Sequence, residues 1–372
     1  MNQPSPSVRR GSIRCYRLFD LGDEIDLSEI VKNVGVGAVR STHLQRRGVR
    51  AMEFIAVPVR IDLGKRPVPL SKFGPHVEAQ VELHLFSFGS ASICIRIPIP
   101  PGTTLESMIP LIGPLYESRD LEELSRKELH ELLPKIRPHI TGYHSWKGCE
   151  TYTILDIQEI DGAPTAQQVL AWPRLANLIL GETREGQLSE GKRREVVGHA
   201  FSYFEHDLAV IEWNSAFLLD PAEDSGIAEM LEFTNTQLLS LRYYDEVLEH
   251  EIDRVHKVLE RGHRSRLFFS PYSRLAHDLF HRLVDLSARL DRIDNTIKVA
   301  GTWHLATAYH ASLDRLLVTT WRQSIERKHE LTSSAYSMLS KETEGSRSLW
   351  LEVTVVLLIL VEIVLAVISG SH

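Results

Sequence analysis

Apolar residues recur at alternating steps of four and three across positions 226–261. This spacing places them on one face of a helix and is typical of a coiled-coil seam. Gly262 is positioned to end that helix. We therefore expect a long helix that joins copies of the chain, with its polar seam positions fixing the register. The seam consists of Ile227, Leu231, Thr234, Leu238, Leu241, Asp245, Leu248, Ile252, Val255 and Leu259.

Two further apolar helical repeats follow, so the pattern predicts a hairpin of long antiparallel helices over 225–346. The turn between its arms is basic and aromatic, and a hairpin tip is exposed to solvent. We expect Arg261, Arg264 and Arg266 to bind a partner there, either an acidic protein, a ribonucleoprotein or lipid headgroups. The alternative is that these arginines are only solvated around aromatic residues that close the hairpin.

The twenty residues from Leu349 to Ile368 are almost all apolar. At about 1.5 Å per residue they extend about 30 Å, the hydrocarbon thickness of a bilayer. Trp350 stands at the entry, where an indole meets the lipid headgroups. Basic residues precede the run and none follows it, so the positive-inside rule places residues 1–348 in the cytoplasm. We expect one C-terminal transmembrane helix and a tail-anchored protein, in preference to a buried core helix.

Two glutamates interrupt this apolar run. Glu352 is near the entry, whereas Glu362 lies close to the middle. A carboxylate at that depth is costly unless it is protonated or paired. We expect Glu362 to hydrogen-bond a neighbouring helix, which requires a homo-oligomer or a membrane partner. The alternative is that Glu362 forms an ion or proton site.

Strand and helix signals alternate through residues 14–220, which predicts an α+β domain behind a disordered basic arm over 1–13. The segment 78–99 reads as two strands that turn at Gly89–Ser90. The segment 199–220 also reads as strand, in two pieces. The predicted fold class is therefore an α+β body, a long coiled-coil-like helical hairpin and one transmembrane helix.

Composition narrows the class of protein. The chain has 372 residues, 43% of them hydrophobic and 24% charged, which excludes a disordered, collagen-like or polytopic membrane protein. The net charge is −7, so we expect no specific DNA binding. The three cysteines form no CxxC pair and no disulfide framework, which favours a reducing compartment.

The search for chemistry finds no P-loop, nucleophile elbow or HExxH motif, and we predict no catalytic residue, no cofactor and no enzyme. His277, His281 and Asp285 share one helical face and could hold a transition metal, but polar neighbours of an apolar seam explain them better. Residues 205–207, Glu-His-Asp, are expected in a surface turn. An enzyme would instead need a pocket that collects His144, His206 and Asp207.

Three segments carry a resemblance to a known family: RLFDLGDEIDLSEIVKNV, HLFSFGSASICI and SRSLWLEVTVVLLILVEIVLAVI. The chain resembles a divergent bacterial-type member of the required-for-meiotic-nuclear-division family, also called the sad1-interacting-factor family. Leu351-Glu352 and Glu362 match the family's anchor, although Trp350 precedes the glutamate instead of following it. The resemblance implies an inner-membrane oligomer that supports translation as a tether, and it supplies no catalytic residue.

These observations define three hypotheses for function. The first is an oligomeric, membrane-anchored scaffold or tether with a cytosolic body, linked to translation or membrane organisation as the resemblance implies. It would reside in the bacterial inner membrane or, alternatively, the mitochondrial inner membrane. The second is an ion channel or transporter assembled from single spans around Glu362. The third is an uncharacterised enzyme in the α+β body.

Overall fold

The computed structural model describes residues 5–33, 38–40, 53–54, 57–70, 74–184, 188–223, 226–262, 297–298 and 303–369, with several residues between 277 and 291. The chain divides into two compact units. Unit 1 comprises Met1–Tyr243 and Asp291–Trp321, and unit 2 comprises Tyr244–Leu290 and Arg322–His372. The division falls inside a long helix, not at residues 220–225, because the first part of that helix packs on the sheet of unit 1.

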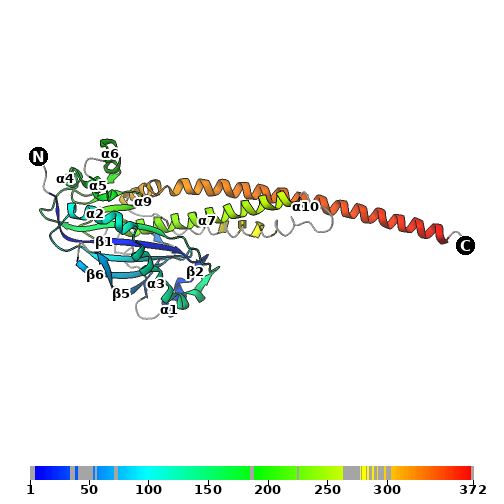
Figure 1. Cartoon of the computed structure of the whole chain (residues 1–372), viewed down its shortest axis with the longest axis horizontal. Helices are drawn as coiled ribbons and strands as arrows, with labels where there is room; N and C mark the ends of the chain where they lie inside the picture. The colour runs from blue at the N-terminus through cyan, green and yellow to red at the C-terminus, as the bar shows by residue number, and fades with distance from the viewer. Residues whose placement is uncertain are drawn as a thin grey trace. The chain divides into compact units, whose positions relative to one another are not determined.

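In the described part of unit 1, ten strands form one sheet (Figure 1). Its order is β11 (Ala200–Phe201), β12 (Leu208–Ile211), β13 (Ser215–Leu219), β10 (Glu150–Ile160), β1 (Ser7–Asp20), β7 (Ser90–Pro98), β6 (Gly74–Leu85), β5 (Val59–Leu70) and β3 (Ala38–Arg40), and β8 (Thr103–Thr104) pairs with β1. Strands β10 and β13 are parallel, and the other pairs are antiparallel. Two small ladders join β2 (Glu24–Ile25) to β9 (Ile140–Thr141) and β4 (Glu53–Phe54) to β14 (Ile297–Lys298).

The predicted strands at 78–99 and 199–220 are confirmed. The first segment contains two antiparallel strands, and the second contains three, because the short strand β11 precedes β12 and β13. Strands β6 and β7 turn at Gly89, whose φ is +92°. A Cβ on this residue would lie 1.8 Å from the carbonyl oxygen of Gly22. Only glycine fits this position, because the turn needs both the left-handed backbone and the close approach.

Short helices cover one face of the sheet: α2 (Leu105–Tyr116), α3 (Arg119–Ile136) and α5 (Leu175–Leu180). Thr104 caps α2 and Ser118 caps α3, and each side chain accepts a hydrogen bond from a backbone amide of the first turn. The remaining short helices are α1 (Leu27–Asn33), the 3₁₀ turn η2 (Arg137–His139), α4 (Ala166–Leu170) and α6 (Glu190–Gly198).

The two faces of the sheet differ in polarity. Along β1, Ile13, Cys15 and Phe19 belong to the apolar core with α2, α3 and α5. The alternate residues, among them Arg14 and Tyr16, point to the other face, because side chains of a strand alternate. Charged residues of β5, β6 and β7 extend this second face, which the start of α7 covers.

The helix predicted over 226–261 is confirmed as α7 (Ile227–Gly262). In unit 1, residues 227–241 of α7 are buried except Glu229, which is partly buried. They lie between the sheet and α9 (Trp303–Arg315), whose Ser312 and Tyr309 hydrogen-bond Thr234 and Gln237 at 3.0 and 3.1 Å. In unit 2, α10 (Val318–Ser369) runs beside α7, and Lys328 pairs with Asp245 at 2.8 Å.

The expectation of a transmembrane helix over Leu349–Ile368 is wrong. Across the residues that the structure describes, every helix is too short or too polar to cross a bilayer. The apolar run is the end of α10, which begins at Val318 with a largely polar sequence and carries Glu352 and Glu362 further along. The run has the length of a span, but glutamates interrupt it and it is one part of a longer, largely polar helix. The fold class is corrected to a mixed α/β body with a large sheet and long helices, and the membrane, transmembrane and tail-anchored assignments are withdrawn.

Candidate functional site

The predicted oligomerisation seam of α7 is covered by the chain itself. Its described apolar residues are buried or half-buried, and Asp245 is paired with Lys328. Pairing of copies through this face stays a prediction, and it would require these internal contacts to open. Buried in unit 1 are Ile227, Leu231, Leu238 and Leu241; in unit 2, Leu248 and Val255 are buried, Ile252 is half-buried, the side chain of Leu259 lies outside the described residues, and Glu362 is exposed.

Most of the other predicted site residues lie outside the residues that the structure describes. Arg264 and Arg266 lie outside the described residues, as does the side chain of Arg261 at the end of α7. His277 and His281 are exposed, with ring centroids 4.5 Å apart, whereas Asp285 is outside the described set. Within that set, no three potential ligands gather around a metal position.

The three candidate residues for an enzyme are not brought together. His144 pairs with Asp20 at 2.7 Å and stacks on Tyr243. His206 donates from Nδ1 to the carbonyl of Pro164. Asp207 borders a hollow of about 10 Å³, which has room for about one water and includes neither histidine among its lining residues. Residues 205–207 lie in the turn between β11 and β12, which confirms the predicted surface turn.

A buried ion-pair network fixes the start of α7 on the polar face of the sheet. Glu229 of α7 lies 3.5 Å from Arg14 of β1 and 3.2 Å from Arg60 of β5. Arg14 also donates to Asp156 of β10 at 2.6 Å. Burial alone would raise the pKa of Glu229, but Arg14 and Arg60 outweigh it and lower the pKa to about 2. The network therefore holds a buried carboxylate in its ionised form.

His84 of β6 continues this network. Its Nδ1 lies 2.7 and 2.9 Å from the two carboxylate oxygens of Glu232, and its Nε2 lies 3.2 Å from Glu82. The side chain is buried, which would lower its pKa, but the two carboxylates outweigh this effect and raise it. The hydrogen bond from His84 is the main cause that lowers the pKa of Glu82 to about 2. Because ionised carboxylates only accept, both ring nitrogens carry protons and His84 is a buried cation.

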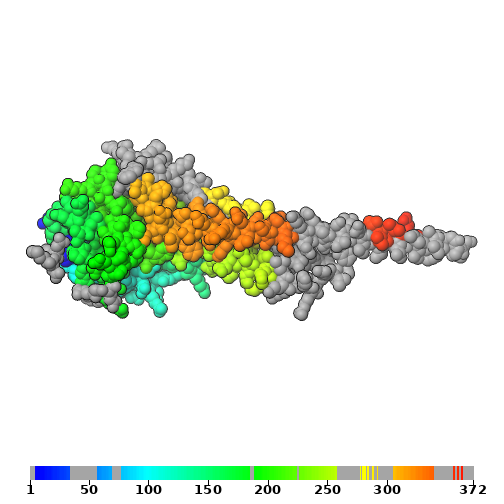
Figure 2. All heavy atoms as spheres, turned by 90° about the horizontal axis from the view of Figure 1, so that it is seen from above, coloured from blue at the N-terminus to red at the C-terminus, as the bar shows by residue number. Residues whose placement is uncertain are grey.

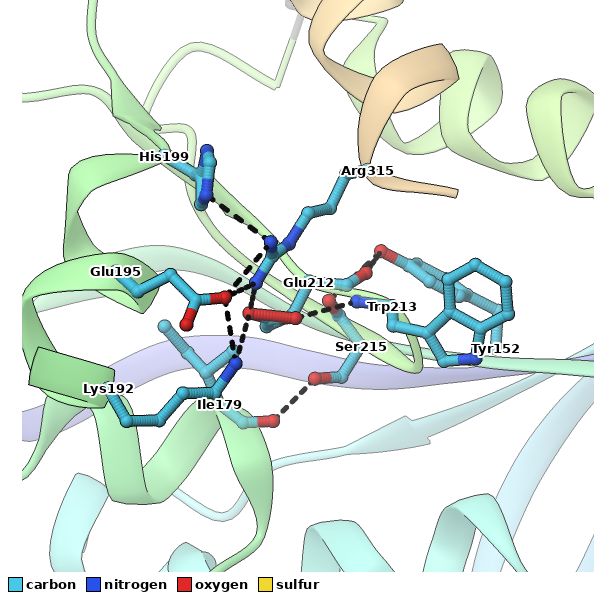
Figure 3. Close-up of polar contacts among 9 residues, drawn as sticks. All are labelled: Tyr152, Ile179, Lys192, Glu195, His199, Glu212, Trp213, Ser215 and Arg315. Atoms are coloured by element: carbon cyan, nitrogen blue, oxygen red, sulfur yellow. Dashed lines mark hydrogen bonds and ion pairs between the residues drawn. The ribbon is translucent and has the colours of Figure 1, made fainter. Parts of the chain in front are cut away.

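A second polar cluster, the Arg315 junction, joins α9 to the body (Figure 3). Arg315, the last residue of α9, pairs with Glu212 in the turn between β12 and β13. It also donates to Glu195 of α6 at 3.3 Å. Lys192 lies 2.9 Å from Glu195 and 3.9 Å from Glu212, so two cations and two carboxylates balance. Hydrogen bonds from Lys192 and Arg315 lower the pKa of Glu195.

The body holds the acidic side of this junction in place. Glu212 is 5% exposed, and one of its oxygens accepts from the backbone amide of Trp213 at 3.0 Å. The hydroxyl of Tyr152 lies 2.9 Å from the carbonyls of both Glu212 and Ser215. Burial raises the pKa of Tyr152, which keeps the hydroxyl protonated as a donor. Ser215 in turn donates to the carbonyl of Ile179 in α5.

His199 completes the junction at its exposed side. Its Nε2 lies 3.3 Å from Nη1 of Arg315. Guanidinium groups only donate, so Nε2 must be the acceptor and the imidazole is neutral in this arrangement. In Figure 2 the orange atoms of α9 lie at the surface against the green atoms of the body. The side chain of His199 is exposed to solvent.

The sequence analysis identified neither cluster, although the residue pattern of the one around Arg14 and His84 was visible in the sequence. Arg14, Arg60, Glu82 and His84 stand at alternate positions of strands whose other residues are apolar, a pattern of a sheet with one polar face. Burial of that face could not be read from the pattern. The Arg315 junction gave no signal, because its partners lie more than a hundred positions earlier in the sequence.

The fold and its two clusters define an α/β-sheet protein with long helices, in which the charged side chains of each cluster pair with one another. The model of the family described as "Uncharacterized protein MJ0711, N-terminal domain" matches residues 10–225, more than half of the chain. The chain belongs to this family. The matched region covers the sheet and Glu212, and it ends just before α7.

One relative is the protein "Uncharacterized protein MJ0711" of Methanocaldococcus jannaschii. It is 25% identical over 252 residues, which cover 68% of this chain and 76% of that protein. No solved structure matches this chain. None of these matches bears on the required-for-meiotic-nuclear-division family, so that resemblance stays a prediction.

Proposed function

We propose that this protein is a self-associating scaffold in which α10 pairs with α10 of a second copy. The observation that carries the proposal is a stripe of exposed apolar residues on that helix. Leu331, Met338 and Val356 are 65%, 62% and 59% exposed. Their spacings of 7 and 18 residues place them within about 20° of one another on a helix that turns 100° per residue. This stripe, the α10 stripe, is free of contacts that would bury it in its own unit.

Further apolar residues are exposed near the end of α10, on other faces of the helix. Val355, Leu358 and Ile359 are each half or more exposed there. Burying such a side chain completely contributes about 1.5–3 kcal/mol, so covering the exposed parts of the three stripe residues contributes a few kcal/mol. Exposed apolar residues that share one helix face are typical of a surface that a partner covers. A partner that covers it is therefore energetically favoured.

A second copy supplies a matching surface without any further component. Two identical stripes related by a twofold axis are self-complementary, and a step of seven residues suits two-stranded packing. This supports an assembly in which each copy presents its α/β body to another macromolecule. A protein or ribonucleoprotein partner at residues 261–274 stays a prediction. The channel hypothesis and the inner-membrane location depended on the membrane span, so neither is pursued.

The test is the native mass of the full chain by sedimentation equilibrium. We expect the unaltered protein to sediment at twice 42.2 kDa. The double variant Met338→Lys/Val356→Lys should sediment as a single copy, because charge on both helices opposes their contact. The matched control is Gln323→Lys/Ser337→Lys, which adds the same charge at exposed positions about 80–120° from the stripe. A single-copy mass for the unaltered chain, or a double variant that still pairs, contradicts the proposal.

A further inference from the structure

The turn between α9 and α10 breaks a helix without a helix-breaking residue. Only Leu316 and Leu317 separate the two helices, and neither glycine nor proline occurs between Trp303 and Trp321. Leu317 has a φ of +53°, in the left-handed region that residues with a Cβ rarely adopt. The residue is 47% exposed, so packing of its own side chain does not explain this conformation. The cause must lie in the neighbouring residues.

Contacts on either side of Leu317 hold the turn. Arg315 is gripped by the junction with Glu212, Glu195 and His199. Leu316 is completely buried, and its amide still donates to Ser312 as in a helix. The amide of Leu317 instead donates to Asp314, one residue closer, so the helical pattern ends there. The contacts of Arg315 and the burial of Leu316 therefore fix the orientation of the last turn of α9.

We infer that this turn is a two-state element. It is bent while Arg315 keeps its contacts with Glu212, Glu195 and His199, and it becomes continuous helix when these contacts break. Leucine and valine at 316–318 are compatible with helix, and straightening returns Leu317 to an unstrained backbone. The local sequence favours helix and only side-chain contacts maintain the bend, so the alternative state is a straight, continuous helix. The inference does not depend on the proposed self-association.

A second positive charge at position 199 would open these contacts with Arg315. The ring of His199 contacts Arg315 of α9. The other charged groups of the cluster, Glu195 and Lys192 of α6 and Glu212 of the β12–β13 turn, contact Arg315 or one another (Figure 3). Neutral His199 accepts from Arg315, whereas a protonated ring places a second cation beside it. That cation also competes with Arg315 for the carboxylates of Glu195 and Glu212. His199 is exposed, so it exchanges protons with solvent.

Amide hydrogen exchange at Val318, Thr319 and Thr320 distinguishes the two states. In the bent state these amides belong to the first turn of α10, which has no preceding helical carbonyls. In a continuous helix they would donate to the carbonyls of residues 314–316. We expect His199→Lys in the full chain to slow exchange at these three amides at least tenfold at neutral pH. The matched control is Ser202→Lys, which adds a cation at a nearby exposed position.

A second pair of variants tests the same inference without changing His199. Arg315→Met should slow the same amides, and Arg315→Met/Leu317→Gly should restore fast exchange because glycine favours the left-handed backbone. The inference is overturned if His199→Lys and Arg315→Met leave exchange at 318–320 unchanged or faster. It is also overturned if the glycine double variant stays as slow as Arg315→Met alone.

Discussion

The imidazole of His84 and the carboxylate of Glu232 form a buried pair, with Nδ1 within 2.9 Å of both oxygens. The pair joins β6 to the second turn of α7, and both side chains are only 4% exposed. A helix that docks through a buried ion pair has a fixed register on the sheet, because sliding by one residue would leave two charges unpaired. The position of α7 on the body is therefore specified by charge as well as by apolar packing.

The pH dependence of stability should follow this pair. The pKa of His84 is raised in the folded state, so its contribution is complete below the unfolded value of about 6.5 and is lost as pH rises through the folded pKa. Glu82 and Glu229 have folded pKa values of about 2, so their contributions hold above about 4.5 and are lost as pH falls toward 2. Urea unfolding across this range should show a maximum between about 4.5 and 6.5. The variant His84→Gln should flatten the alkaline side, and an unchanged slope there would exclude His84 as its source.

Removing the charge of Glu229 should destabilise the protein strongly. Glu229→Gln leaves Arg14 and Arg60 with one buried anion fewer, which costs about 3–5 kcal/mol in the free energy of unfolding. The control is Glu223→Gln, whose ion pair with Arg10 is more than half exposed on both sides and contributes at most about 1 kcal/mol. Equal losses for the two variants in denaturant unfolding would mean that burial does not distinguish these pairs.

Strain at Leu317 should appear in a comparison of two small substitutions. Leu317→Gly relieves the left-handed backbone and should be about 1 kcal/mol more stable than Leu317→Ala. In an ordinary helix position the order is reversed by a similar amount. Thermal unfolding of the two variants measures the difference directly. Alanine equal to or better than glycine would show that the bend stores no strain.

Gly89 should tolerate no side chain, because two separate effects oppose it. Gly89→Ala adds a methyl group 1.8 Å from the carbonyl of Gly22 on a backbone with φ of +92°. Gly102 has a similar φ of +85° but open space around its Cβ position. We expect Gly102→Ala to cost about 1 kcal/mol from backbone strain alone, and Gly89→Ala at least about 3 kcal/mol. Chemical denaturation of both variants separates the clash from the strain.

Local pattern predicted the parts of the fold that depend on neighbours in sequence. The four-three repeat located α7 to within one residue at each end, and alternation located β6 and β7. The same repeat could not show that the sheet and α9, and not another chain, cover Leu231 and Leu238. The apolar run at Leu349–Ile368 has the length of a membrane span, and its length and its position near the end of the sequence led to the wrong assignment.

The candidate sites depend on contacts that sequence does not display. Arg315 meets Glu195 and His199 from more than a hundred positions away. No spacing rule connects such residues, since only the fold brings α9 against α6. The polar alternation around Arg14 and His84 was visible, but a polar strand face is usually solvated, and its burial depends on where α7 packs.

The position of β1 in the sheet has a consequence for the order of folding. Strand β1 is synthesised well before the strands that pair with it: Tyr16 pairs with Cys94 of β7 and with Tyr152 of β10. A fourteen-residue strand therefore leaves the ribosome with both hydrogen-bonding edges unsatisfied. The sheet cannot be completed until β13 has also emerged to pair in parallel with β10. Such distant pairing is intrinsically slow, so the nascent body should need protection from aggregation until nearly its whole length has been made.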